Sequence, residues 1–205
     1  MFCRTLLVLS FLSLAATANA ATPAEPDWPC QQRLVPHLAF ATYWAGPAPP
    51  AGADWHADPR LAALIEEISP RGIATEDGIA KLTAFAQRLS EAERAKTLPL
   101  AFAGLVDQSN EERDAVISRL KALGARQRSL AKRIESDEAA LQATPADAGG
   151  DQASERAGIA ERHDLLVRSY HDIGETIRYA CQVPSDLDAR LGAYARALAG
   201  QLGAK

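Results

Sequence analysis

The sequence predicts an all-α protein: a helical bundle built on a long antiparallel helical hairpin, with an irregular N-terminal arm. Apolar and small residues recur at alternating three- and four-residue spacing in the long stretch before residues 145–151, and a second apolar stripe follows these residues. Residues 21–57 contain seven of the twelve prolines and all three tryptophans, which disfavours a long helix there. No stretch shows the alternating pattern of a half-buried strand.

The first arm of the hairpin is predicted from a stripe of apolar and small residues in which Gln127 fills one seam position. This spacing is typical of a coiled-coil-like seam. Two starts are compatible with it: the capping-box pattern of Ser109–Glu112, and Thr97 ahead of Pro99. Apolar continuity favours the start at Thr97, and Pro145 ends the arm. The stripe consists of Ile117, Leu120, Gly124, Ala131, Ile134 and Leu141.

The second arm is predicted to follow the polar turn at 145–151 and to end at Gln182–Pro184. Two apolar stripes joined by a short turn are most simply buried against each other, so we expect an antiparallel hairpin within residues 97–181. A hairpin of this length is expected to project beyond the rest of the domain. The second stripe consists of Ile159, Leu166, Ile173, Ile177 and Ala180.

Shorter helices are predicted on both sides of the hairpin from their capping signals. Asp58 followed by Pro59 opens a helix that runs to about Ile68, and Thr75 is expected to cap the next one. The capping box of Ser90–Glu93 starts a short piece that leads into the first arm. Ser185–Asp188 is expected to begin the last helix.

Residues 1–20 have the pattern of a signal peptide. Arg4 precedes the short apolar run Leu6–Ala16, and Ala18–Ala20 forms a small-residue cleavage site. We therefore expect export, most simply to a bacterial periplasm or as a secreted protein, with cleavage after Ala20. The remaining chain is expected to divide into the arm, 21–57, and a helical domain, 58–205.

Cleavage after Ala20 would remove one basic residue, Arg4, and no acidic one. The mature chain would then have 21 basic and 26 acidic residues, a net charge of −5. This balance argues against general nucleic-acid binding, which usually requires a basic domain. The only methionine is Met1, so methionine-ligated copper and His/Met haem sites are excluded from the mature chain.

Two cysteines, Cys30 and Cys181, remain after removal of the signal peptide. In an oxidising compartment such a pair usually forms a disulfide, which would join the arm to the end of the second hairpin arm. A redox-active pair is the alternative. A structural bridge is favoured because Cys-x-x-Cys is absent and neither cysteine lies at an obvious helix start.

The arm carries the aromatic residues Trp28, Trp44 and Trp55. Packing of these side chains over the base of the bundle is the favoured interpretation, because tryptophan in an irregular segment needs a covering surface. The alternative is an aromatic recognition surface for a partner or a carbohydrate.

Three segments are informative beyond their periodicity: Asp27–Arg33, Tyr43–Pro47 and Phe102–Asp107. They resemble segments of an uncharacterised family of exported bacterial helical proteins with no known activity. The resemblance covers most of the mature chain and implies the helical architecture, without implying a mechanism.

No catalytic, cofactor or metal site is predicted. The chain lacks Glu-x-x-His, Cys-x-x-Cys-His, Gly-x-Ser-x-Gly and a phosphate-binding glycine loop. His171 and Glu175 are spaced for a shared metal, but they fall on the outward side of the second stripe. These observations favour a protein that is not an enzyme. A triad can converge from distant positions, so that alternative stays open.

A basic run occupies the first arm from Arg113 to Arg133, with seven basic residues and one acid. Arg119, Arg126 and Arg133 repeat every seven residues beside the seam. The favoured interpretation is pairing with acids of the opposing arm, as at flanking positions of coiled coils. The alternative is an anionic partner, either lipid headgroups or an acidic protein. The candidate acids are Glu161, Asp164, Asp172 and Glu175.

These patterns together favour an exported, non-enzymatic helical protein that binds another envelope protein through its hairpin or its aromatic arm. The second hypothesis is a periplasmic bundle that holds a small apolar molecule where the arm covers the helices.

Overall fold

The computed structural model describes residues 27–147 and 149–203, so the expected signal peptide lies outside the described residues. Every regular element in this part of the chain is helical, which confirms the predicted all-α class. The elements in order are α1 (Phe40–Tyr43), the 3-10 turn η1 (Trp55–Ala57), α2 (Pro59–Ile68), α3 (Thr75–Gln87), α4 (Glu91–Ala143), α5 (Asp151–Ala180) and α6 (Val183–Leu202).

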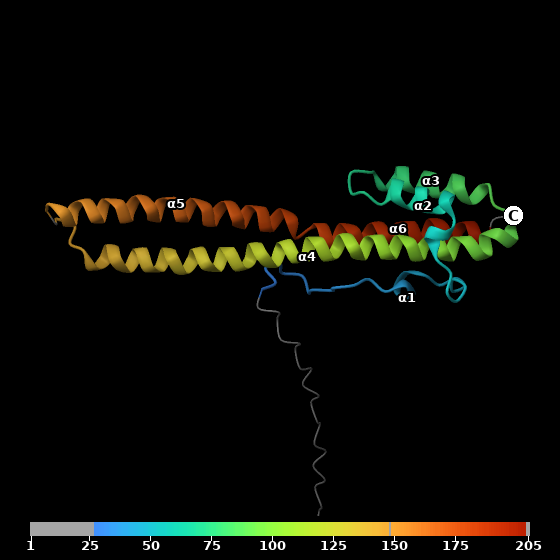
Figure 1. Ribbon diagram of the computed structural model, residues 1–205, viewed down its shortest axis with the longest axis horizontal. Coiled ribbons are helices and arrows are strands. Elements are labelled where there is room, and N and C mark those ends of the chain that lie inside the picture. The colour runs from blue at the N-terminus through green and yellow to red at the C-terminus, as the bar shows by residue number, and fades with distance from the viewer. Residues whose placement is uncertain (1–26, 148, 204–205) are drawn as a thin grey trace, which may run out of the picture.

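The hairpin is built on α4, a 53-residue helix about 80 Å long. Helix α5 returns antiparallel along the distal half of α4, and α6 continues along the proximal half (Figure 1). The direction changes at Cys181 and Gln182, between α5 and α6. One long helix is therefore flanked along its length by two consecutive helices. The predicted helical hairpin bundle is confirmed.

The first arm begins at Glu91, so the predicted starts at Thr97 and Ser109 are wrong. Ser90 is the N-cap and forms the predicted capping box with Glu93, but this box opens α4 itself. Pro99 lies inside the helix and is buried. Burial of the apolar face through this region carries the helix past the proline, which removes only one amide donor.

Two other predicted caps are displaced, while Asp58 behaves as expected. Its side chain accepts a hydrogen bond from the amide of Arg60 at 2.9 Å. Thr75 is the first residue of α3, and the N-cap, Ala74, makes no side-chain bond. Helix α6 begins at Val183 rather than Ser185, since a proline at its start leaves no required hydrogen bond unmade.

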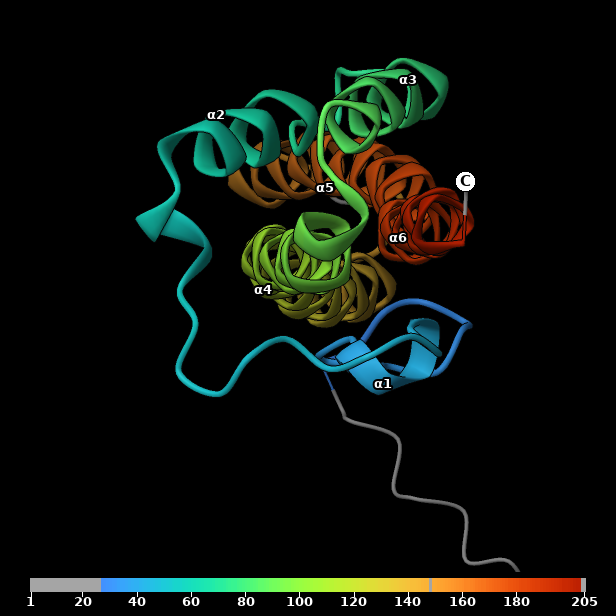
Figure 2. The ribbon, with the colours of Figure 1, turned by 90° about the vertical axis from the view of Figure 1, so that its right-hand side faces the viewer.

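The main core lies at the base of the molecule, where α2 and α3 cover one side of α4 and α6 (Figure 2). Phe102 of α4 is fully buried there. A second, smaller cluster joins α4 to α5 in the distal half and consists of Leu130, Leu166, Ile173 and Ile177. None of the helices described is long and apolar enough to cross a membrane.

The arm follows the other side of α4, opposite α2 and α3 (Figure 2). The Cα atoms of Cys30 and Cys181 lie 5.6 Å apart, which is the separation of a disulfide, as predicted. Gly124 permits the close approach of the arm, because a Cβ at this position would meet the carbonyl oxygen of Asp27 at 3.0 Å. The N-terminal arm is thus held against both helices of the hairpin.

Candidate interaction surface

The distal half of the hairpin contains only α4 and α5 in the described chain, because α2 and α3 lie beside α6 (Figure 1). Its apolar cluster is small, and two of the side chains that pack on it, Leu123 and Ile134, are only partly buried. Leu165 of α5 is 52 % exposed. This half therefore projects from the base and offers most of its surface to a partner.

A line of charged residues runs along α4 at seven-residue intervals. It begins at Glu112, which pairs with Arg71 of the α2–α3 loop at 2.5 Å, and it continues through Arg119, Arg126 and Arg133. All three of these arginines are exposed. Within the residues that the structure describes, none of the three forms an ion pair within 4.0 Å. They are therefore accessible to an external anion.

The pairing expected for these arginines with acids of α5 is not formed. Glu175 contacts Arg178 of its own helix, and Asp164 lies 3.6 Å from the ring of His163. Seven-residue spacing beside a seam is therefore not sufficient for interhelical ion pairs. The opposing carboxylates must also lie on the same side of the hairpin and within reach of the guanidinium groups.

Two other members of the basic run hold the arm in place. Arg113 is only 5 % exposed and donates to the carbonyl oxygens of Val35, at 3.1 Å from Nε, and Pro184, at 2.6 Å from Nη1. Burial lowers its pKa from the usual arginine value. Arg128 pairs with Asp27 at the start of the described arm. These two guanidinium groups therefore serve the fold.

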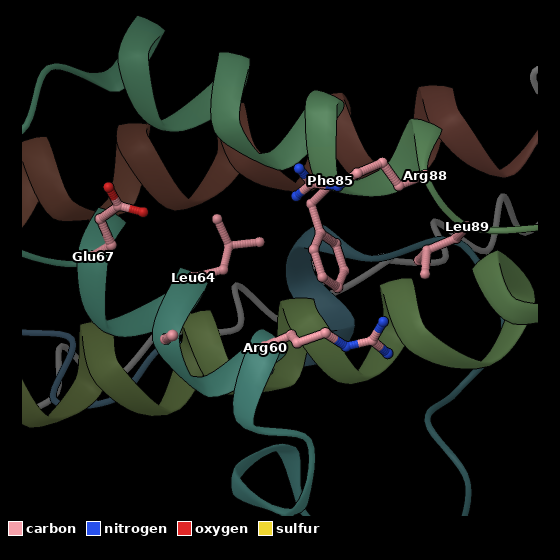
Figure 3. Close-up of a pocket in the computed structure, with 7 residues that line it drawn as sticks. Arg60, Leu64, Glu67, Phe85, Arg88 and Leu89 are labelled. Carbon is pink, nitrogen blue, oxygen red and sulfur yellow. The ribbon is translucent and has the colours of Figure 1, made fainter.

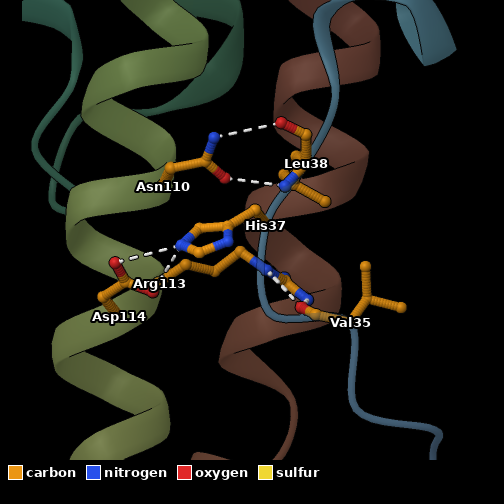
Figure 4. Close-up of polar contacts among 6 residues, drawn as sticks. All are labelled: Val35, His37, Leu38, Asn110, Arg113 and Asp114. Carbon is orange, nitrogen blue, oxygen red and sulfur yellow. Dashed lines mark hydrogen bonds and ion pairs between the residues drawn. The ribbon is translucent and has the colours of Figure 1, made fainter.

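Asn110 completes this fastening, as Figure 4 shows. Its amide oxygen accepts from the backbone N–H of Leu38 at 2.7 Å, and its amide nitrogen donates to the Leu38 carbonyl at 3.0 Å. Nearby, His37 lies 3.4 Å from Asp114. A side-chain amide thus replaces the two backbone hydrogen bonds that an adjacent strand would supply.

An arginine–carboxylate ion pair joins the two helices of the hairpin near the tip. Arg162 of α5 donates two hydrogen bonds to Asp137 of α4, at 2.9 and 2.6 Å, and Asp137 is only 6 % exposed. These bonds, with smaller contributions that include Arg133, hold the pKa of Asp137 below its usual value. Arg133 and Arg162 therefore lie on the same side of the hairpin.

The tryptophans of the arm are mostly occupied with packing. Trp44 is 6 % exposed and stacks on Phe102 with ring centroids 5.2 Å apart. Trp55 is 5 % exposed, and its indole N–H donates to Asp107 at 3.2 Å. Trp28 is half-buried and donates to the carbonyl of Gln32 at 2.7 Å. Little indole surface is left for recognition.

A hollow of about 550 Å³ opens beside the disulfide, on the side of the hairpin that the arm covers. Ile177 and the two bonded cysteines contribute apolar surface to it. The amide groups of Gln31, Gln127 and Gln182 also line it and make no hydrogen bond within the described chain. The hollow could accept a small uncharged ligand.

A second hollow, of about 440 Å³, lies between α2 and α3 (Figure 3). Leu64, Phe85 and Leu89 line it, together with charged side chains at its edge. Arg60 is already paired with Asp58 at 3.2 Å. Across the described residues, no group of three or more His, Cys, Asp or Glu side chains is arranged to hold a metal ion.

The sequence reasoning missed Asn110 and the Arg162–Asp137 pair. No motif distinguishes either of them, although a lone acid at a seam position such as Asp137 calls for a cationic partner. Comparison with known proteins adds no assignment: no family model, no curated protein and no solved structure matches this chain.

Proposed function

We propose that this protein is an exported, non-enzymatic interaction module of the bacterial envelope, and that its distal hairpin binds another envelope protein. One observation carries the proposal. Arg119, Arg126 and Arg133 form an exposed line on a two-helix projection, and within the described chain none of them forms an ion pair within 4.0 Å. Exposed guanidinium groups are well suited to carboxylates of a partner.

The construction of the base supports this role. The large core, the disulfide and the hydrogen bonds of Asn110 and Arg113 lie in the proximal half or at its border with the distal half. The distal half has a small core of its own. A rigid base that presents a projecting pair of helices is expected of a scaffold or docking module.

Two observations support export. The first 20 residues have the composition of a cleaved signal peptide. The two cysteines outside that segment lie at disulfide distance, and disulfides persist mainly in oxidising compartments such as the periplasm. Intact-mass measurement of the exported protein would test this part directly, because retention of Met1 would contradict it.

The interaction is tested with a shortened hairpin. Deletion of residues 130–143 together with 151–164 removes two heptads from each arm and keeps the turn and the register of the seam. The disulfide and the base core remain in this variant. Crosslinking and pull-down from envelope extracts should recover partners with the full chain and lose them with the shortened one. Recovery of the same partners would contradict a role for the removed part of the hairpin, which carries Arg133 and Arg162.

A charge variant tests the observation itself. Replacement of Arg119, Arg126 and Arg133 by Gln should reduce partner recovery without changing the fold, because all three side chains are exposed. Arg88→Gln is the matched control, since Arg88 is an exposed arginine at the end of α3, away from the hairpin. Because Arg88→Gln removes one charge and the triple variant removes three, a loss in Arg88→Gln as large as in Arg119→Gln alone would show that only total charge matters.

The second candidate function is small-ligand binding in the hollow beside the disulfide. It is favoured by the three unbonded glutamine amides that line a space of the size of a ligand pocket. Native mass spectrometry of protein purified from its host tests it. A bound small molecule that is lost in Gln127→Leu would favour this function over the first.

A further inference from the structure

We propose that the segment recognised by the hairpin is an acidic amphipathic α-helix, which packs as a third helix beside the arginine line. This inference rests on the proposed function and names the chemistry of its partner. The surface concerned is called the arginine face. It is formed by Arg119, Leu123, Arg126 and Arg133 of α4, with Arg162 and Leu165 of α5.

The contacts place both helices of the arginine face on one side of the hairpin. Arg133 precedes Asp137 by one helical turn, and Asp137 is bonded to Arg162. Leu165 follows Arg162 by three residues, which makes the two side chains neighbours on the surface of α5. The exposed leucine therefore lies on the same side as the arginine line.

The other end of the face is fixed by the α2–α3 loop. Arg71 of this loop pairs with Glu112, the member of the charged line that precedes Arg119. The same loop borders a hollow with Tyr179, which lies two heptads beyond Leu165 on α5 and is 78 % exposed. The layer formed by α2 and α3 thus ends where the arginine face begins (Figure 1). A third helix would extend that layer toward the tip.

The spacing of the side chains on the arginine face fits a helical partner better than a partner with a flat surface. The arginines repeat every seven residues, about 10.5 Å along the axis. Leu123 lies one turn beyond Arg119 and is partly buried, so it leaves some apolar surface beside the basic line, as core and flanking positions do in a coiled coil. Leu130, one turn beyond Arg126, is buried against α5. A partner with leucines on its inner face and glutamates at flanking positions would match both.

The charges around the face favour an acidic partner. Its basic groups are Arg119, Arg126, Arg133 and Arg162. The acids on this side include Asp137, which Arg162 occupies, Asp172, one heptad beyond Leu165, and Glu155, one heptad before Arg162. The basic groups therefore outnumber the acidic ones along α4 but not along α5. An acidic helix is therefore expected to place its glutamates toward α4.

The inference is tested with two synthetic 28-residue peptides of identical composition. One carries leucine at the inner positions and glutamate at flanking positions every seven residues, and the other carries the same glutamates on its outer face. Binding to the full mature protein is measured by calorimetry at 0.15 M salt. The in-register peptide should bind at least tenfold more tightly. Each single Arg→Gln change should weaken it about two- to fivefold, as for exposed ion pairs.

Three results would overturn the inference. Equal binding of both peptides would show only nonspecific attraction. Binding to phosphatidylglycerol vesicles that the in-register peptide does not displace would assign the face to lipid. A self-associated protein that excludes the peptide would make a second copy the occupant. Arg88→Gln is again the control and should leave peptide binding unchanged.

This experiment separates the two proposals. If the shortened hairpin loses its partners while both peptides bind equally, the proposal of an acidic helical partner is wrong. The proposed function as an interaction module is then still supported. If the shortened hairpin and the triple variant of Arg119, Arg126 and Arg133 both keep their partners, the proposed function fails whatever the peptides do.

Discussion

Removal of the Cys30–Cys181 disulfide is expected to destabilise the protein substantially without unfolding it. The two residues are separated by 151 positions, so the bond constrains nearly the whole unfolded chain. The chain-entropy model gives about 5 kcal/mol for a loop of this length at 25 °C. Measured values usually fall below the model, so we expect a loss of about 2–5 kcal/mol in the free energy of unfolding.

The folded state should survive the loss of the bond because the arm has other attachments. Trp44 remains stacked on Phe102, and Asn110 still bonds Leu38. The double variant Cys30→Ser/Cys181→Ser should therefore keep its helical signal in circular dichroism. Urea unfolding should show a lower midpoint, and the melting temperature should fall by roughly 5–20 °C.

Reductant provides the control. Dithiothreitol should shift the unfolding midpoint of the natural chain to that of the double variant, and it should not affect the variant itself. Two free thiols in the unreduced mature protein would refute the reasoning at its start. A change below about 1 kcal/mol would show that the bond does not constrain the unfolded chain as the model requires.

The remaining predictions concern a matched pair of glycines and one buried carboxylate. Gly78→Ala should destabilise by about 1–3 kcal/mol in urea unfolding, because an added methyl group would overlap the buried phenol of Tyr194. Gly158→Ala should instead stabilise by up to about 1 kcal/mol, since nothing lies within 4 Å of its added methyl and alanine is the better helix former. A loss in both would mean that helix propensity and packing do not explain these positions.

Asp137 should contribute to acid sensitivity. Its pKa is lowered in the folded state, so its stabilisation is present above the ordinary carboxyl value of 3.8 and is lost as the pH falls through the folded value. Asp137→Asn should lower the free energy of unfolding at neutral pH. It should also make the unfolding midpoint depend less on pH below 3.8, and Arg162→Gln should have the same two effects. An unchanged profile in either variant would contradict the pairing.

Much of the fold follows from periodicity and from the chemistry of helix ends. The two apolar stripes predict the hairpin, Pro145 and the glycines after it predict the turn, and Asp58 predicts a cap that the structure confirms. The two cysteines outside the expected signal peptide predict their own pairing. These features depend on neighbouring residues or on the number of cysteines, so they can be predicted from the sequence without the tertiary structure.

The start of α4 could not be decided this way. Ser90, Thr97 and Ser109 all have helix-start chemistry, and the choice depends on which segments are buried. Burial of Leu98 and Phe102 by α2, α3 and the arm makes the helix continuous, and the cap at Ser109 has no unpaired amide to satisfy. That burial is contributed by residues distant in the sequence.

The sequence by itself determined which residues share a face of each helix, because that depends only on the helical repeat. Only the tertiary structure decided what each face meets. Arg113 is buried against the arm, Arg128 pairs with Asp27, and Arg119, Arg126 and Arg133 remain exposed, although all belong to one basic run. The partner of a charge depends on how neighbouring elements are rotated and placed about the helix, and no periodicity within a single helix specifies that.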